Sequence, residues 1–108
     1  RVLYPGLASR PTHALAQRQM RHGGSVVVID LAGGFDAGVA LVERCEVVTP
    51  AVSLGGPETL LTHPASMSAA TLSSEERAAM GIPDGLIRLS IGLEHPDDVI
   101  DDLVTALG

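Results

Sequence analysis

The chain has 108 residues, the usual size of one domain, and its 45% hydrophobic content is enough for one core. Aromatic residues make up only 2%, so this core must be aliphatic. With a net charge of -6 and no basic patch, we expect no nucleic-acid partner. No apolar run reaches the roughly 18 residues that predict a membrane span, and the first residues lack the apolar segment of a signal peptide. Cys45 is the only cysteine, which fits a reducing, cytoplasmic environment.

Hydrophobic periodicity and turn residues predict a series of short helices and strands. Residues 1–11 predict no element of their own. In chain order, we expect a helix over 12–21, a strand over 25–31, a helix over 36–45, short strands over 46–49 and 58–62, a helix from 74 that ends at 81, a strand over 85–92 and a helix from 96 to the end.

Several of these helices have recognisable start signals. Thr12 is an N-cap candidate for the first helix, and Ser73 with Glu76 fits a capping box. Pro96 suits the first position of the last helix, and the acids that follow suit the positive end of its dipole. We interpret the acidic side of this helix, Asp102 included, as a solvated face.

This order of elements predicts one α/β (α+β) domain over 1–108, with a small, mostly antiparallel sheet and helices on one face. In the 85–92 strand, alternation places Ile87, Leu89 and Ile91 on one face of the sheet. Leu86, Arg88 and Ser90 lie on the other. The second face then needs a cover, and Arg88 points towards it.

Arg88 is the first candidate for a functional role, because an arginine between aliphatic strand residues is costly to bury unless it meets an anion. Its planar fork suits a carboxylate. A salt bridge to an internal acid or a solvated strand face would explain the residue equally well. The loop over 53–56, Ser-Leu-Gly-Gly, could bring backbone N–H groups to an anion, or be a plain turn.

Other chemistry finds little support. The four histidines lack metal-ligand spacing, and we expect each to be structural or on the surface. There is no GxSxG motif and no nucleotide-binding glycine loop. We expect Cys45 to be a small, partly buried side chain. All seven basic residues are arginines, so chemistry that needs a Schiff-base lysine must take the lysine from elsewhere.

Three stretches together resemble one known family: YPGLASRPTHALAQRQM at 4–20, AVSLGGPETLLTHPASMS at 51–68 and GIPDGLIRLSIGLEHPDDVIDDL at 81–103. In this order they look like the C-terminal domain of the fold-type I, pyridoxal-phosphate (PLP) enzymes of cysteine and methionine metabolism. The family includes cystathionine γ-lyase, cystathionine γ-synthase, cystathionine β-lyase, methionine γ-lyase and the homoserine-ester sulfhydrylases. The resemblance covers essentially the whole chain.

The resemblance implies roles for four residues. Arg88 matches the arginine that grips the substrate α-carboxylate, and Ser53 matches a serine that helps to hold it. Ser68 stands where relatives carry a threonine that lines the substrate site. Val52 stands at a position linked to reaction choice, with glutamate in many cystathionine γ-enzymes and valine in members similar to methionine γ-lyase. One departure is Ala69, which replaces the histidine of the usual HPASMTH run.

By the same resemblance, 1–108 is the substrate-binding domain, and the PLP cofactor and its lysine belong to an N-terminal domain absent from this chain. PLP would act as the electron sink of a γ-elimination or γ-replacement on a sulfur amino acid, in a cytoplasmic homotetramer. The fragment would be inactive alone. The favoured reaction is of the methionine γ-lyase or cystathionine γ-lyase type. Alternatives are a cystathionine γ-synthase, an O-acetyl- or O-succinylhomoserine sulfhydrylase, and a non-catalytic amino-acid-binding or dimerisation module.

Overall fold

The computed structural model describes residues 1–108 as one five-stranded sheet with four helices. The strand order is β1-β2-β5-β4-β3, and every neighbouring pair is antiparallel except β3 with β4. The mostly antiparallel α/β prediction is therefore confirmed. In chain order the elements are β1 (Val2–Leu3), α1 (His13–Gln19), β2 (Val26–Asp30), α2 (Gly34–Arg44), β3 (Thr49–Pro50), β4 (Leu60–Thr62), α3 (Ser74–Ala79), β5 (Leu86–Ser90) and α4 (Pro96–Leu107).

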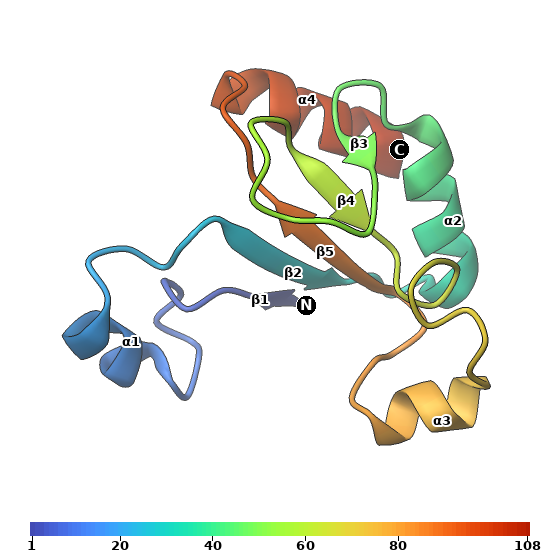
Figure 1. Ribbon diagram of the computed structural model, residues 1–108, viewed down its shortest axis with the longest axis horizontal. Coiled ribbons are helices and arrows are strands. Elements are labelled where there is room, and N and C mark those ends of the chain that lie inside the picture. The colour runs from blue at the N-terminus through green and yellow to red at the C-terminus, as the bar shows by residue number, and fades with distance from the viewer.

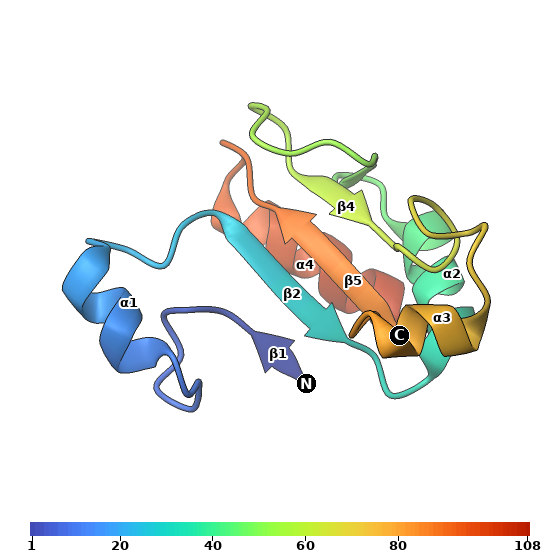
Figure 2. The ribbon, with the colours of Figure 1, turned by 60° about the horizontal axis from the view of Figure 1, so that its bottom comes forward.

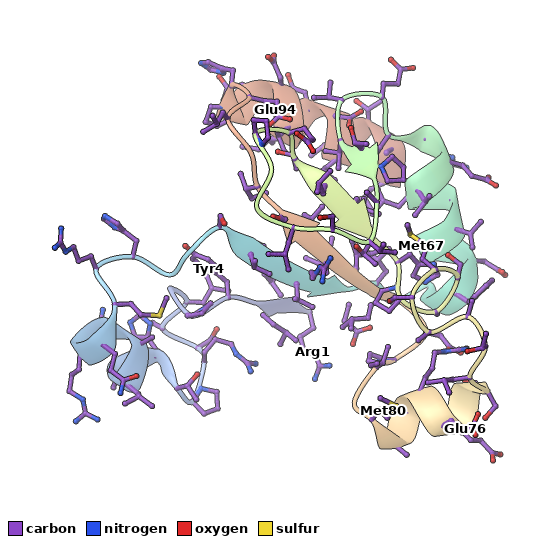
Figure 3. The ribbon with its side chains drawn as sticks, viewed as in Figure 1. Arg1, Tyr4, Met67, Glu76, Met80 and Glu94 are labelled. Atoms are coloured by element: carbon purple, nitrogen blue, oxygen red, sulfur yellow. The ribbon has the colours of Figure 1, made fainter.

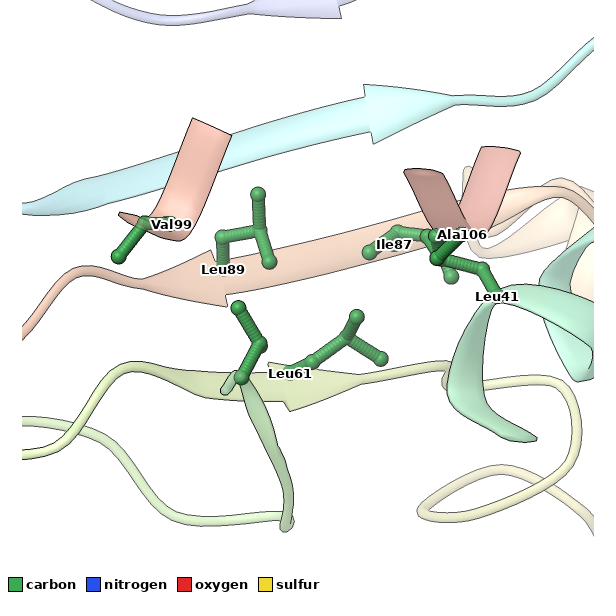
Figure 4. Packing of buried hydrophobic residues seen from close by; sticks show 7 residues of the cluster. Leu41, Leu61, Ile87, Leu89, Val99 and Ala106 are labelled. Carbon is green, nitrogen blue, oxygen red and sulfur yellow. The ribbon is translucent and has the colours of Figure 1, made fainter. Parts of the chain in front are cut away.

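The core lies between one face of the sheet and the helices α2 and α4 (Figures 1 and 2). Helices α1 and α3 lie outside this layer, to either side of the sheet in Figure 1. The core is aliphatic, as the composition predicts, and Figure 4 shows its strand and helix side chains facing one another. Its buried members are Leu41, Val48, Leu61, Ile87, Leu89, Val99 and Ala106. No helix has both the length and the apolar character that a membrane crossing requires.

The alternation predicted for β5 is confirmed over the length of the strand. Ile87 and Leu89 are buried on the core face, whereas Arg88 pairs with Val28 of β2 and Thr62 of β4. Directly paired strand residues point to the same side of a sheet. Arg88, Val28 and Thr62 therefore share the face opposite the helices, and the segment between β3 and β4 crosses part of that face (Figure 1).

The three predicted helix starts are confirmed, two of them with the expected capping features. Ser73 and Glu76 form a reciprocal capping box, with Glu76 on the outside of α3 (Figure 3), and Pro96 occupies the first turn of α4. Thr12 is the N-cap residue of α1, as predicted, but its side chain makes no capping hydrogen bond. Its backbone, with φ −93° and ψ 5°, is outside the extended region that directs a capping hydroxyl towards the helix N–H groups.

Residues 1–11 contain a short strand that the sequence did not predict. β1 pairs with the edge of β2 through Val2 and Leu3. A strand of this length is specified by the backbone groups of its neighbour and has no alternation of its own to detect.

The third strand begins later than predicted, at Thr49 instead of residue 46. Asp102, on α4, explains the delay, because its carboxylate accepts hydrogen bonds from three consecutive backbone N–H groups. The donors lie 2.8, 3.0 and 2.8 Å away, on Glu46, Val47 and Val48. These N–H groups are therefore unavailable to a neighbouring strand. The interpretation of Asp102 as part of a solvated face is wrong.

Asp102 also sets the electrostatics of this corner. Burial alone raises its pKa, but the hydrogen bonds from Glu46, Val48 and Val47 outweigh that effect and hold the pKa below its usual value. Burial, followed by the nearby Asp102 charge, raises the pKa of the Cys45 thiol to about 11. The thiol therefore stays protonated at neutral pH. Cys45 is partly buried against the core, as expected.

We expect Asp102→Ala to lower the free energy of unfolding by about 1–2 kcal/mol, since it removes three hydrogen bonds, one of them to the N–H group of the buried Val48. Urea unfolding followed by circular dichroism measures this loss, with the exposed neighbour Asp101→Ala as the matched control. The difference between wild type and variant should be full above about pH 5 and shrink as the pH falls through the lowered pKa of Asp102. Equal stabilities of the two variants at neutral pH would contradict this role.

Candidate functional site

Arg88 lies half-buried in the middle of β5, and one end of its guanidinium is held by the protein. Nη2 donates to the carbonyl oxygens of Val52 at 2.9 Å and Ser53 at 2.8 Å, and to Thr62 Oγ1 at 3.1 Å. Nη1 makes no hydrogen bond to the protein. Nε is buried and has no partner at all. The side chain is therefore fixed at Nη2, with donors left over at Nη1 and Nε.

Arg88 has no acidic partner, which overturns the alternative of an internal salt bridge. The ion pairs of the chain are Arg1–Asp30, Arg77–Asp84 and His95–Asp97. Arg77, which is buried, makes a useful comparison, because its Nη2 lies 2.7 Å from Asp84 Oδ1. Hydrogen bonds from Ser74 and then Arg77 lower the pKa of Asp84. The fold therefore pairs Arg77 with a carboxylate, whereas Arg88 has no carboxylate partner within the chain.

The loop over 51–57 reaches Arg88 with its carbonyl oxygens. At one end, the Ala51 N–H donates to the Leu61 carbonyl at 2.9 Å. At the other, the Gly55 N–H donates to Ser90 Oγ at 3.0 Å, and Gly55 has a φ of +78°, which favours glycine. The Gly55 N–H is therefore occupied, and the prediction that this loop brings N–H groups to an anion is not supported there. The loop instead orients the arginine.

The structure brings three of the four predicted site residues together. Val52 and Ser53 contact Arg88 through their carbonyl oxygens, and both residues are exposed. The Ser53 hydroxyl makes no hydrogen bond and is free to meet a ligand. Ser68 is exposed in the turn after β4 and makes no hydrogen bond to Arg88. Ala69, next to it, is buried at 8% exposure, with its N–H 2.8 Å from the Pro64 carbonyl.

Thr62 is a site residue that the sequence reasoning missed. It is 3% exposed, and its hydroxyl contacts Arg88 Nη2 while donating to the Ala51 carbonyl. The sequence does hold one signal for Thr62 as a site residue: it is a threonine at the end of the predicted 58–62 strand, where its hydroxyl can meet a neighbouring strand. Its register against Arg88, however, depends on long-range pairing that a single sequence does not specify.

His63 follows Thr62 and is fully buried, consistent with the structural role that we expect for it. Its Nε2 lies 2.7 Å from the Asp84 carbonyl, which can only accept, so Nε2 carries the proton. Nδ1 then accepts from the Ser66 hydroxyl at 2.8 Å. The centroids of the His63 and Phe35 rings are 5.4 Å apart. The backbone N–H of His63 contacts the sulfur of Met67 at 3.3 Å (Figure 3 labels Met67). His63 therefore fixes the turn that follows β4.

The arrangement is a small α/β domain with a half-buried arginine that has no counter-charge in the chain, and comparison with known proteins identifies the class of this domain. The family profile of Cys/Met metabolism PLP-dependent enzymes matches residues 1–108. The chain belongs to this family.

Individual relatives agree on the family and differ in their activities. An L-methionine gamma-lyase of Fusobacterium nucleatum subsp. polymorphum is 49% identical over 107 residues, which are 99% of this chain and 27% of that protein. The crystal structure of cystathionine gamma synthase from Xanthomonas oryzae pv. oryzae, in complex with aminoacrylate and cysteine, has a TM-score of 0.88 at 48% identity and covers 99% of this chain and 28% of that one. Cystathionine gamma-lyase of Micromonospora echinospora has a TM-score of 0.90 at 44% identity, with 99% and 28% covered. The chain thus spans about a quarter of these relatives.

The residues of this chain do not fit covalent attachment of the family cofactor. No lysine is present, and no group of three or more His, Cys, Asp or Glu side chains is arranged to hold a metal ion. The site that the chain does form is the arginine with its supporting loop, which suits an anionic group of a ligand.

We expect Gly38→Ala to destabilise the chain by about 1–3 kcal/mol, although alanine usually stabilises a helix relative to glycine. A Cβ at Gly38 would collide with the His63 ring. In a His63→Ala background, the same change should cost little, so thermal unfolding of the four members of this double-mutant cycle measures the coupling. Additive effects would show that the ring is not held against Gly38.

Proposed function

We propose that this chain is the substrate-carboxylate site of a PLP-dependent enzyme that acts on sulfur amino acids by γ-elimination or γ-replacement. The observation that supports this most is the half-buried Arg88, which has no acidic partner and a buried, unpartnered Nε. A half-buried cation without a counter-charge is costly. A bound carboxylate would supply the missing charge.

The supporting contacts suit this use. The carbonyl oxygens that hold Nη2 are uncharged, so they orient the guanidinium without neutralising it. A carboxylate that accepts from the free Nη1 would gain roughly 1.5–3 kcal/mol from that charge-assisted hydrogen bond. Fixing one end of an amino acid in this way lowers the entropic cost of placing its reacting carbons.

Ser53 and Ser68 extend the proposed site. The free hydroxyl of Ser53 is on the residue whose carbonyl already contacts Arg88, and it would donate to the same carboxylate. Ser68, exposed on the turn after β4, would line the substrate site from that side. The covalent chemistry belongs to PLP and to residues outside this chain, since the chain has no lysine. We propose that the complete enzyme is a cytoplasmic homotetramer, as the family resemblance and the single cysteine suggest.

Val52 favours a methionine γ-lyase type of reaction over a cystathionine-specific one. Its side chain is 60% exposed, beside the Arg88 anchor. An aliphatic group there has no charge to meet the distal ammonium of cystathionine, whereas a carboxylate would attract it.

In the full-length enzyme, we expect Arg88→Ala to lower kcat/KM for amino-acid substrates by about 10- to 100-fold, mainly through KM, because the charge-assisted hydrogen bonds are lost. Arg88→Lys should recover only part of this, since lysine lacks the planar fork. The exposed Arg44→Ala is the control for loss of an arginine elsewhere. Unchanged steady-state kinetics for Arg88→Ala would refute the proposal, and carboxylate binding without turnover in wild type would favour a non-catalytic binding module.

We expect the wild-type enzyme to turn over L-methionine with a higher kcat/KM than L-cystathionine or O-acetylhomoserine. Val52→Glu should shift the methionine-to-cystathionine ratio of kcat/KM towards cystathionine by about 5- to 10-fold, the effect of one partly exposed charge pair of roughly 1 kcal/mol. Val52→Gln, which is similar in shape and uncharged, is the control. Dominant cystathionine cleavage by wild type would contradict this assignment.

A further inference from the structure

The hydroxyl of Thr62 connects Arg88 to the loop that supports it. Thr62 and Arg88 are directly paired residues of β4 and β5, so their side chains leave the sheet on the same side. Thr62 is 3% exposed, and the next residue, His63, is fully buried and bonded through both ring nitrogens. The backbone at Thr62 is therefore fixed both by strand pairing and by the buried His63 that follows it.

The direction of each hydrogen bond at this hydroxyl is determined by chemistry. A threonine hydroxyl has one proton and two lone pairs, a carbonyl only accepts, and a guanidinium only donates. The Thr62 proton therefore goes to the Ala51 carbonyl, and a lone pair of the same oxygen accepts from Arg88 Nη2 at 3.1 Å. One oxygen atom thus fixes both the start of the 51–57 loop and the arginine.

This arrangement determines which donors of Arg88 remain free. Nη2 has two N–H groups and three acceptors, on Val52, Ser53 and Thr62, so the protein uses it fully. Without the Thr62 hydroxyl, the carbonyl of Ala51 loses its donor and the loop that carries the other two acceptors loses an attachment. The guanidinium and its loop would then loosen together.

We propose that Thr62 is a positioning residue for the substrate carboxylate: its hydroxyl holds the guanidinium of Arg88 by Nη2, so that Nη1 is left to donate to the ligand. Threonine suits this better than serine, because branching at Cβ restricts χ1 and fixes the hydroxyl. The inference rests on the proposed function of Arg88 and assigns Thr62 no contact with substrate.

The test compares Thr62→Val, which keeps the shape and removes the hydroxyl, with Thr62→Ser, which keeps the hydroxyl, in the full-length PLP-loaded enzyme. The probes are L-norleucine, an amino acid with no sulfur leaving group, and L-norleucinamide, in which the carboxylate is an uncharged amide. The measurement is the inhibition constant of each probe. Thr62→Val should raise the constant for norleucine by about 3- to 30-fold, the range for one weakened charge-assisted hydrogen bond, and leave that for norleucinamide within about 2-fold. Thr62→Ser should stay within about 3-fold of wild type for both.

Thr59→Val is the matched control, because Thr59 is also a fully buried threonine with a bonded hydroxyl, which donates to Glu94 and lies outside the Arg88 site (Figure 3 labels Glu94). It should change the two inhibition constants by the same factor. Thermal unfolding reports any general loss of stability. If Thr62→Val does not accumulate as folded protein, Thr62→Ala repeats the measurement without adding an apolar group next to the guanidinium.

Equal effects of Thr62→Val on norleucine and norleucinamide, or no effect on either, would overturn the positioning role. These outcomes are separable from failure of the proposed function. If Arg88→Ala raises the norleucine constant and Thr62→Val does not, only the role of Thr62 is wrong. If Arg88→Ala leaves the norleucine constant unchanged, the carboxylate site itself is wrong, and the inference about Thr62 fails with it.

Discussion

The register of β5 between β2 and β4 is the constraint on which the rest of the structure depends. It places Ile87 and Leu89 in the core and, in the same step, puts Arg88 opposite Thr62 on the other face. A slip of one residue would exchange the two faces, burying the guanidinium among aliphatic side chains. Because that exchange is strongly unfavourable, hydrophobic packing on one side of the sheet fixes the position of a charge on the other.

The buried Arg77 and the half-buried Arg88 illustrate how differently one small fold treats the same side chain. Arg77 meets Asp84 and helps to close the segment around α3, so its charge is balanced within the chain. Arg88 meets only neutral oxygens and keeps an unsatisfied Nε. A pairing that looks incomplete in a stable fold indicates that the missing partner comes from outside. Both side chains are at least partly buried, so the counter-charge is what distinguishes the structural Arg77 from Arg88 and its proposed ligand-binding role.

Local signals explain why much of the fold was predictable from the sequence. The capping box at Ser73, the β-branched residues of β2 and the alternation in β5 each act over a few residues, and each is confirmed. The failures involve partners distant in sequence. β1 exists through its pairing with β2, and the start of β3 is set by Asp102, more than fifty residues away. Arg88 and Ser53 could be proposed as neighbours because the family resemblance carried that information, whereas Thr62 required the register itself.

Under the proposed function, the contacts of Val52 would link reaction preference to substrate anchoring. The Val52 carbonyl accepts from Arg88, while its side chain, 60% exposed, extends from the same residue. The loop therefore cannot shift to suit a different substrate without disturbing the guanidinium that would hold every substrate. A rigid strand carries the anchor, and the variable side chain sits on a loop tied to it at both ends through Ala51 and Gly55. In the proposed site, a change of specificity would disturb Arg88 least if it replaced the side chain at 52 and kept the loop backbone, because the loop contacts Arg88 only through the carbonyl oxygens of Val52 and Ser53.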